Sequence, residues 1–369
     1  MKKKIILAEP VINSRETIKL TKRVLSANFP NEGKFAKLIE NKLSKLINTK
    51  YVVTTTSGTA SIFLALKAIG IKKNDEVIVP NITFPATANA VELSGAKVVL
   101  ADVNKNNLLI DEKKLLQYIN NKTKAIIPVH ISGRGSNIGK ILKIAKRKKL
   151  FVIEDAAEAF MSKNGNKHLG TFGDAGCFSF APNKIITTGQ GGAVVTKNKS
   201  IYKNLLRLKD QGRTGLKTGG DDKYSSIGYN FKYTDLQAVL GLAQLTKIRE
   251  RVNILKNNYK IYKKNLIETN NFKLIGFDIK KGECPLWVDV HCLKRKKMYN
   301  FLKKNNINCR YFWQPLNTFK PYKQSFSLLK NSKKLQGKLM WLPSSLNLSK
   351  KDLTKICNKI NKFNLKNEK

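Results

Sequence analysis

Residues 150–196, LFVIEDAAEAFMSKNGNKHLGTFGDAGCFSFAPNKIITTGQGGAVVT, contain three short apolar runs joined by polar turns. The first run ends in the carboxylate pair Glu154 and Asp155, and the second, AGCFSF, leads into a turn that carries Lys184. The third, AVVT, follows a glycine-rich connection. Short apolar runs bounded by glycine and polar residues predict strands of a buried sheet. Lys184 therefore lies between two predicted strands, whereas the other lysines crowd helix-like surfaces.

Lys184 is a candidate for covalent catalysis. A lysine forms a Schiff base as the free amine, and partial burial favours that form because it disfavours the ammonium. If the partner is an aldehyde cofactor with a pyridine ring, a carboxylate must keep the ring nitrogen protonated. Asp155, at the end of the preceding strand, is placed for that role. A solvated loop lysine is the alternative, but Asp155, Ser179 and the flanking glycines together favour chemistry.

The whole chain then resembles a known family, the DegT/DnrJ/EryC1/StrS sugar aminotransferases, and in particular its perosamine synthase-like members. These are pyridoxal-phosphate enzymes of fold type I. The resemblance rests on six segments in family order: TTSGTASIFLAL (55–66), VPNITFPATANA (79–90), EDAAEA (154–159), GDAGCFSFAPNK (173–184), TTGQGGAVVT (187–196) and IGYNFKYTDLQAVLGLAQL (227–245). Looser similarity extends from about residue 5 to about residue 350.

The expected fold is α/β. Strands alternate with helix-like segments through residues 50–200, which predicts successive βα units and a mainly parallel sheet covered by helices. The resemblance implies fold type I with a smaller α+β C-terminal domain. We expect a large cofactor-binding domain at 1–245, in which 1–30 form an arm near the substrate site, and a small domain at 246–369.

The resemblance also implies the residues that contact the ring of the cofactor, pyridoxal 5′-phosphate. Lys184 would bind it covalently and Asp155 would pair with its ring nitrogen. Phe84 would stack on the ring face, although an ordinary core phenylalanine is the alternative. Glu158 would approach the phenolic oxygen, a position that is often glutamine or histidine in the family.

A second group of residues is expected around the cofactor phosphate. Ser57, Gly58 and Thr59 lie at a predicted helix N-terminus, where free N–H groups favour an anion, and ordinary helix capping is the alternative. Ser179 matches the family serine that binds the phosphate. Asn230 matches an asparagine that reaches the phosphate of the neighbouring subunit. It implies a homodimer or larger assembly with shared active sites.

Several further residues are candidates for the substrate site. Phe29 and Asn31 lie in a loop that the resemblance brings near the sugar, although turn formation is their alternative role. His130 ends a predicted strand on the ligand side of the sheet, where it either approaches the substrate or packs as a hydrogen-bonded histidine. The aromatic-rich segment 308–316 contributes the remaining candidates, for which ring packing is the alternative: Arg310, Tyr311 and Trp313.

The net charge of +45 at first suggests a nucleic-acid-binding protein. However, the basic residues are spread along the entire chain, without an arginine-rich arm or a basic segment interleaved with aromatic residues. We therefore assign the basic residues to solvated faces of the protein, where their charge can attract an anionic nucleotide-linked substrate. We expect no nucleic acid as a partner.

The cysteine content and the hydropathy of the sequence indicate the cellular compartment. The five cysteines and three histidines show no metal-ligand spacing, so we expect neither a metal nor a disulfide framework. The N-terminal apolar run is interrupted by Glu9 and Pro10 and is too short for a signal peptide. No window has the apolar length of a membrane span. A cytoplasmic protein without a membrane partner is expected.

The expected reaction moves an amino group from L-glutamate to a nucleotide-linked keto-sugar, with pyridoxamine phosphate formed between the half-reactions. A 4-keto-6-deoxy sugar is the expected acceptor, and the amino sugar would serve surface polysaccharide or glycan biosynthesis. A 3-keto or N-acetylated sugar nucleotide is the alternative. Two alternatives from other classes are a non-catalytic regulator with the same fold, which would be expected to lose Lys184 or Asp155, and a basic nucleic-acid-binding protein.

Overall fold

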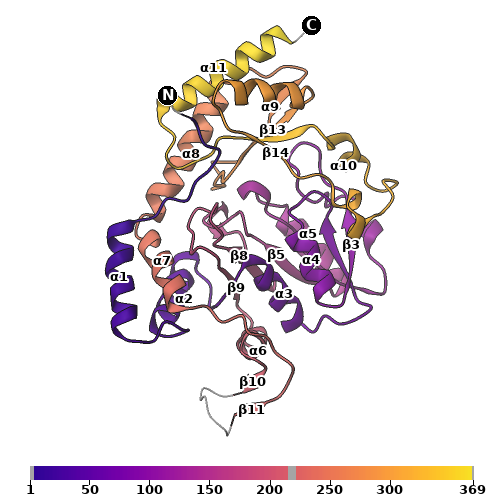
Figure 1. The fold of residues 1–369 in the computed structure, drawn as a ribbon. Coiled ribbons are helices and arrows are strands. Elements are labelled where there is room, and N and C mark those ends of the chain that lie inside the picture. The colour runs from indigo at the N-terminus through magenta and orange to yellow at the C-terminus, as the bar shows by residue number, and fades with distance from the viewer. Residues whose placement is uncertain (1–3, 215–221, 368–369) are drawn as a thin grey trace.

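The computed structural model describes residues 4–214 and 222–367. A seven-stranded sheet forms the centre of the described chain (Figure 1). Its strand order is β1-β9-β8-β5-β4-β2-β3, with β1 at Tyr51–Thr55, β2 at Glu76–Pro80, β3 at Lys97–Ala101, β4 at Thr123–Ile126, β5 at Phe151–Asp155, β8 at Ala175–Ser179 and β9 at Gly192–Thr196. Among these seven strands β9 runs antiparallel to both β1 and β8, and the other pairs of neighbouring strands are parallel. The predicted mainly parallel sheet is confirmed.

Both faces of the sheet are covered because its strands are apolar on both sides. Val52 and Val53 are adjacent in β1, yet their side chains enter different core clusters on opposite faces. One face packs on α3 (Gly58–Ala68), α4 (Ala86–Leu93) and α6 (Lys199–Lys209). The other packs on α2 (Lys34–Ile47) and α7 (Asp235–Leu245) at one end and on α5 (Ile138–Lys148) at the other.

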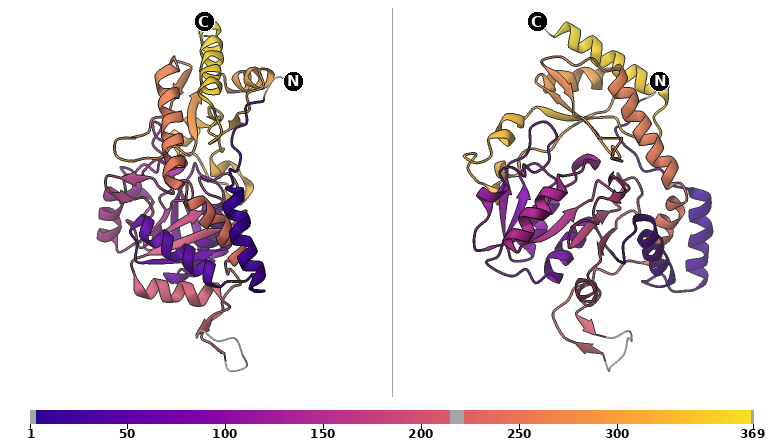
Figure 2. Two further views of the ribbon diagram at one scale, coloured as in Figure 1. Left: turned by 90° about the vertical axis from the view of Figure 1, so that its left-hand side faces the viewer. Right: turned by 180° about the vertical axis from the view of Figure 1, so that it is seen from behind.

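A second sheet organises the C-terminal unit, by which we mean residues 248–367 apart from 316–336. Its order is β12-β13-β15-β14, at Phe272–Leu274, Val288–Cys292, Leu339–Leu342 and Arg310–Tyr311. It packs on α8 (Ile248–Asn265), α9 (Arg295–Lys304) and α11 (Lys350–Lys366) through a core of its own. Figure 2 shows this unit standing above the large sheet, with α8 rising from one to the other.

The predicted boundary after residue 245 falls between α7 and α8, but segments cross it in both directions. Ile5 pairs with Ile307 and is buried in the core of the C-terminal unit. Conversely, Leu316, Tyr322 and Leu329 are buried with the helices of the large sheet. The N-terminal arm leads from Ile5 into α1 (Ser14–Ser26).

The remaining elements of the described chain are short. The hairpin of β10 (Arg213–Thr214) and β11 (Lys223–Tyr224) projects from the large unit, on the side away from the C-terminal unit (Figure 2). The others are β6 (Lys163–Asn164), β7 (Lys167–His168), α10 (Lys330–Leu335) and four 3₁₀ turns, η1 (Leu115–Tyr118), η2 (Ile131–Gly133), η3 (Leu316–Thr318) and η4 (Lys320–Tyr322). Within 4–214 and 222–367, no helix is long and apolar enough to cross a membrane.

Candidate active site

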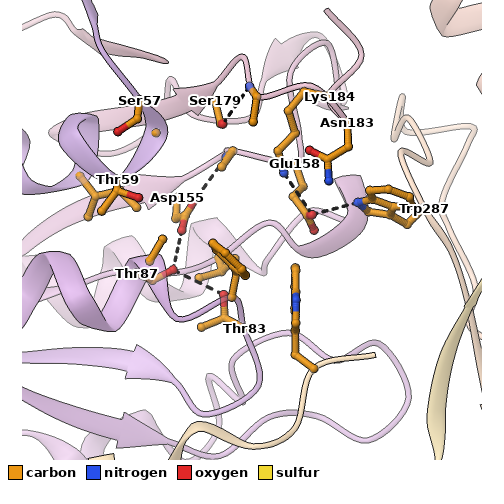
Figure 3. A pocket seen from close by; sticks show the side chains of 18 of the residues that line it. Ser57, Thr59, Thr83, Thr87, Asp155, Glu158, Ser179, Asn183, Lys184 and Trp287 are labelled. Carbon is orange, nitrogen blue, oxygen red and sulfur yellow. Dashed lines mark hydrogen bonds and ion pairs between the residues drawn. The ribbon is translucent and has the colours of Figure 1, made fainter. Parts of the chain in front are cut away.

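The carboxyl ends of several sheet strands meet at one edge and form a cavity of about 300 Å³. Asp155 ends β5 and Ser179 ends β8, while Ser57 and Phe84 follow β1 and β2. All four side chains line the cavity together with Lys184. Ligands of α/β proteins bind outside the carboxyl ends of such strands. Residues far apart in sequence thus line one cavity (Figure 3).

Lys184 extends into this cavity and meets Glu158. Its Nζ lies 3.2 Å from Glu158 Oε1, and the lysine side chain is only 12% exposed. The same oxygen accepts a 2.9 Å hydrogen bond from Trp287 Nε1, and Glu158 Oε2 accepts one of 2.9 Å from the backbone N–H of Ser132. Glu158 is therefore fixed at both oxygens and holds the lysine amine in place. Figure 3 shows its contacts with Lys184 and Trp287.

Asp155 is a buried carboxylate beneath the cavity, 5% exposed. Thr87 Oγ1 donates a 2.7 Å hydrogen bond to its Oδ2, and the Ala157 N–H donates one of 3.1 Å to its Oδ1. Burial raises the pKa of Asp155, while the hydrogen bonds from Thr87 and Ala157 and the charge of Lys184 oppose the rise. A cationic group bound next to Asp155 would offset the free-energy cost of burying its negative charge.

The start of α3 forms a small cradle against the end of β8. Ser57 caps the helix by accepting a 3.1 Å hydrogen bond from the Ala60 N–H, so its predicted alternative role as a cap is confirmed. A Cβ at Gly58 would lie 2.8 Å from Ser179 Cβ, which leaves no room for a larger residue. The first N–H groups of a helix lack intrahelical partners and attract anions. The cradle suits a phosphate flanked by the Thr59 and Ser179 hydroxyls.

Aromatic side chains from both units form one wall of the cavity. The Phe84 ring lies 5.7 Å from the Trp313 ring, and Trp313 packs edge-on against Trp341 at 4.8 Å. Trp287 stacks on Trp341 at 5.3 Å. Phe84 is 55% exposed, which is unusual for a core phenylalanine and leaves its ring available to a ligand. All three tryptophans of the chain line this cavity.

Some of the predicted substrate residues do not line the cavity. Their position depends on long-range packing, which local sequence does not reveal. His130 is fully buried: its Nε2 lies 2.8 Å from Glu154 Oε2, and its Nδ1 accepts a hydrogen bond from Ser136 N–H. The packed alternative is therefore right for His130. Tyr311 packs on Tyr299 with ring centres 4.8 Å apart, and only Arg310 and Trp313 of its segment line the cavity.

The loop that carries Phe29 and Asn31 also lies outside the cavity of its own chain. Asn31 O accepts a 2.8 Å hydrogen bond from Asp235 N–H, which ties the loop to the start of α7. Phe29 is 53% exposed. Asn230 is exposed as well, and its backbone pairs with Asp210. The substrate roles predicted for Phe29 and Asn31, and the role predicted for Asn230 in a neighbouring subunit, therefore stay predictions.

The sequence did not reveal several residues of the site. Thr87 lies in the quoted segment 79–90, three residues after Phe84, and its place in the first turn of α4 was a usable signal. Thr83, Asn183 and Gln190 also line the cavity and lie within the quoted segments, next to or near predicted residues. Leu7, Trp287 and Trp341 gave no local signal, because their position depends on how the arm and the C-terminal unit fold back.

Comparison with known proteins identifies the family. The model of the DegT/DnrJ/EryC1/StrS aminotransferase family matches residues 11–361. The chain belongs to this aminotransferase family. It is 34% identical to the GDP-perosamine synthase of Escherichia coli O157:H7, over 98% of this chain and 99% of that protein. It is 32% identical to the GDP-perosamine synthase of Vibrio cholerae, over 96% and 98% of the two chains.

A solved structure agrees with this assignment. Helicobacter pylori PseC, an aminotransferase involved in the biosynthesis of pseudoaminic acid, superposes with a TM-score of 0.91. The two chains are 26% identical, and the match covers 98% of this chain and 99% of PseC. The protein therefore has fold type I and is an aminotransferase of the pyridoxal-phosphate-dependent class. The resemblance stated from the sequence is confirmed.

The residues of the family site fit pyridoxal phosphate. The cradle at Gly58 has the character of a phosphate site, the buried Asp155 suits a protonated ring nitrogen, and Lys184 offers an amine of the kind that the aldehyde requires. Within the described residues, no group of three metal-ligating side chains is present. The roles of the individual residues toward the cofactor remain proposals.

Proposed function

We propose that the protein transfers an amino group from L-glutamate to a nucleotide-linked keto-sugar. One observation carries the proposal: Lys184 enters the cavity 3.2 Å from Glu158, with the buried carboxylate Asp155 lining the same cavity. Names of relatives support the substrate class, since two similar proteins are GDP-perosamine synthases. The retained Lys184 and Asp155 argue against a non-catalytic regulator.

In this proposal, each polar residue has a distinct task. The bound cofactor would supply an electron sink that makes the proton on the donor's α-carbon acidic. Lys184 Nζ takes up that proton as a general base and later gives it back as a general acid. Asp155 keeps a negative charge beside the ring nitrogen, and Thr87 holds its Oδ2 at 2.7 Å. Ser57, Thr59 and Ser179 anchor the phosphate, assisted by the N-terminus of α3.

For the acceptor, we propose a 4-keto-6-deoxy sugar linked to a nucleotide. The wall of Phe84, Trp313 and Trp341 supports this choice, since aromatic faces bind the apolar face and methyl group of a deoxy sugar. Arg310 lines the same cavity and can bind an anionic phosphate or carboxylate. A 3-keto or N-acetylated sugar nucleotide remains the competing acceptor.

The proposal also includes a shared active site. Asn230 is exposed and outside the cavity of its own chain, which leaves it free to reach the phosphate in a second copy. A homodimer, or a larger assembly built from such dimers, would then be the active form.

An absorption spectrum of the protein loaded with pyridoxal phosphate tests the first half-reaction. We expect a visible band that L-glutamate shifts to shorter wavelength in the wild type and not in Lys184→Ala. Nucleotide-linked 4-keto-6-deoxy sugars should restore the band, whereas 3-keto isomers should not. A wild type that binds no cofactor, or whose band ignores glutamate and every other amino acid, would contradict the proposed reaction.

A further inference from the structure

A buried ion pair connects the C-terminal unit to the loop that follows β4. Arg134 in this loop is 1% exposed and forms an ion pair with Asp289 of β13, which is 0% exposed. Arg134 Nε also donates a 2.9 Å hydrogen bond to Gly276 O. Burial raises the pKa of Asp289, and the guanidinium of Arg134 opposes that rise. Burying two charges costs free energy, so a pair of this kind often fixes a geometry rather than adding stability.

The same loop is held in an unusual backbone conformation. Ser132 has φ +56°, a left-handed geometry that costs a non-glycine residue about 1 kcal/mol or more. Three hydrogen bonds hold it there: Oγ donates to Asp289 Oδ1 at 3.0 Å, O accepts from Leu286 N–H at 2.9 Å, and N–H donates to Glu158 Oε2 at 2.9 Å. Backbone strain of this kind gathers at functional sites.

Gly133 shows how closely the two units meet at this loop. It has φ +97°, and a Cβ there would lie 2.0 Å from Cys284 O. Ser162 Oγ adds a 2.9 Å hydrogen bond to Gly133 O and accepts one of 2.9 Å from Cys284 N–H. Residues 132–134 are therefore clamped between the large sheet and the C-terminal unit.

The clamp continues to the reactive lysine through Glu158. One oxygen of Glu158 is bound by Ser132, and the other is shared by Trp287 Nε1 and Lys184 Nζ. Trp287 lies two residues before Asp289. The C-terminal unit therefore contacts both Glu158 and Arg134 through β13 and the residue just before it. The buried carboxylates of Asp155 and Asp289 also interact electrostatically with Glu158, and Arg310 lines the same cavity.

We propose that Arg134 and Asp289 are positioning residues that set the reactivity of Lys184 through Ser132 and Glu158. The ion pair fixes Ser132, the strained Ser132 N–H fixes one oxygen of Glu158, and the other oxygen then faces Lys184 Nζ. The docked C-terminal unit thereby sets the position and the reactivity of the Lys184 amine. The inference concerns the lysine of the proposed function and deepens that function.

The decisive variant removes both charges, as Arg134→Met/Asp289→Leu. It changes no net charge and leaves no unpaired ion in the core, so its stability should stay near that of the wild type. Ser332→Ala is the matched control. Ser332 makes a buried 2.8 Å hydrogen bond to Asp102 between a C-terminal segment and the large sheet, and it has no contact with Glu158.

The first readout needs no cofactor. The rate at which a small amine-reactive reagent labels Lys184 is measured by mass spectrometry, relative to other lysines of the chain. In the wild type Glu158 Oε1 holds Lys184 Nζ at 3.2 Å, so releasing Glu158 should make the amine more available to the reagent. We expect about threefold faster labelling in the double variant, and no change in Ser332→Ala. Unchanged labelling of Lys184 in the folded double variant would overturn the proposal.

The second readout is the visible band of the protein loaded with pyridoxal phosphate. In the double variant its pH midpoint should move, and kcat should fall about 10- to 100-fold with little change in KM. A wild-type band and kcat in the double variant would also overturn the proposal. If the wild type takes up no cofactor, the proposed function fails, while the labelling rate still decides the role of the clamp.

A milder variant covers the case in which the double variant does not fold. Ser132→Ala removes the hydroxyl bond to Asp289 and keeps the N–H that binds Glu158. It should speed labelling of Lys184 by a smaller factor than the double variant does. Arg134→Lys keeps the charge, so its labelling rate should lie between those of the wild type and the double variant. Equal labelling in Ser132→Ala and wild type would then count against the clamp.

Discussion

At the scale of single residues, Asp155 depends on Thr87. The threonine hydroxyl donates a 2.7 Å hydrogen bond to a carboxylate whose pKa is raised by burial. Thr87→Val keeps the shape and removes the donor, so the carboxyl should hold a proton more readily and support the ring nitrogen less well. A hydrogen bond to a charged group contributes about 1.5 to 3 kcal/mol, which corresponds to a rate loss of roughly 10- to 100-fold.

Single-turnover measurements with L-glutamate check this prediction. Thr87→Ser is the matched control, because it retains the hydroxyl, and it should stay within about threefold of the wild type. If the valine and serine variants react equally fast, Thr87 does not support Asp155.

His168 gives a second prediction at this scale, concerning stability and pH. Burial lowers its pKa from 6.5 to about 4, Lys163 adds to the shift, and its Nδ1 is buried without a hydrogen-bond partner. In the unfolded chain His168 takes up a proton near pH 6.5, whereas in the folded chain it stays neutral until the pH approaches about 4. The free energy of unfolding should therefore fall as the pH drops from about 6.5 to about 4, by up to about 3 kcal/mol.

Urea unfolding at several pH values measures this term. His168→Leu lacks the titrating group, so the difference between its stability and that of the wild type should change across this window and be constant above pH 7. Parallel stability curves for the two proteins would show that His168 is not responsible for acid sensitivity.

At the scale of elements, the meeting of α3 with β8 determines the phosphate cradle. A Cβ at Gly58 would lie 2.8 Å from Ser179 Cβ and 3.1 Å from its Oγ, and a strand backbone moves only at a cost. Gly58→Ala should cost about 1 to 3 kcal/mol of stability and weaken binding of pyridoxal phosphate at least tenfold. The affinity is measured by titrating the apoprotein while its tryptophan fluorescence is followed, since all three tryptophans line the cavity.

Gly139 is the matched control for this substitution. It lies in α5, and a Cβ there meets nothing within 4 Å. Gly139→Ala should leave cofactor affinity unchanged and add up to about 1 kcal/mol of stability. A Gly58→Ala protein with normal affinity would mean that the phosphate is bound elsewhere.

At the scale of the whole molecule, the site joins segments from the entire chain. Leu7 comes from the N-terminal arm, Lys184 from the large unit, and Trp287, Trp313 and Trp341 from the C-terminal part. The proposed assembly extends this principle to a second subunit through Asn230. Lys184→Ala and Asn230→Asp should each be inactive, the latter because a carboxylate would repel the phosphate.

Mixing the two inactive proteins tests this arrangement. After denaturation and refolding together, half of the dimers are hybrids, and each hybrid has one site with both native residues. We expect about one quarter of wild-type activity in the mixture and none in either parent refolded alone. No recovery from a mixture that contains hybrids would mean that Asn230 serves its own subunit, and an active Asn230→Asp parent would mean that it serves neither.

Much of this protein was determined by local sequence. The β-branched and apolar runs predicted the strands. Asp155 and Ser179 are the last residues of two of them, and the turns after strands carry Lys184 and the glycine at the start of α3. Because parallel strands end at the same edge of a sheet, these residues had to meet once the βα pattern was recognised. Their gathering at one cavity is thus a consequence of backbone periodicity and connection rules.

Only the tertiary structure decided which polar residues face the cavity and which are buried behind it. Glu154 precedes Asp155 in β5, and His130 follows β4, yet the two side chains bind each other in the core. Successive side chains of a strand point to opposite faces, so Glu154 and Asp155 enter different environments. Trp287, Arg134 and Asp289 carry no local signal, since their roles depend on how the C-terminal unit docks. Long-range packing leaves no periodic pattern in the sequence. It fixes the Glu158 carboxylate, which in turn holds the amine of Lys184.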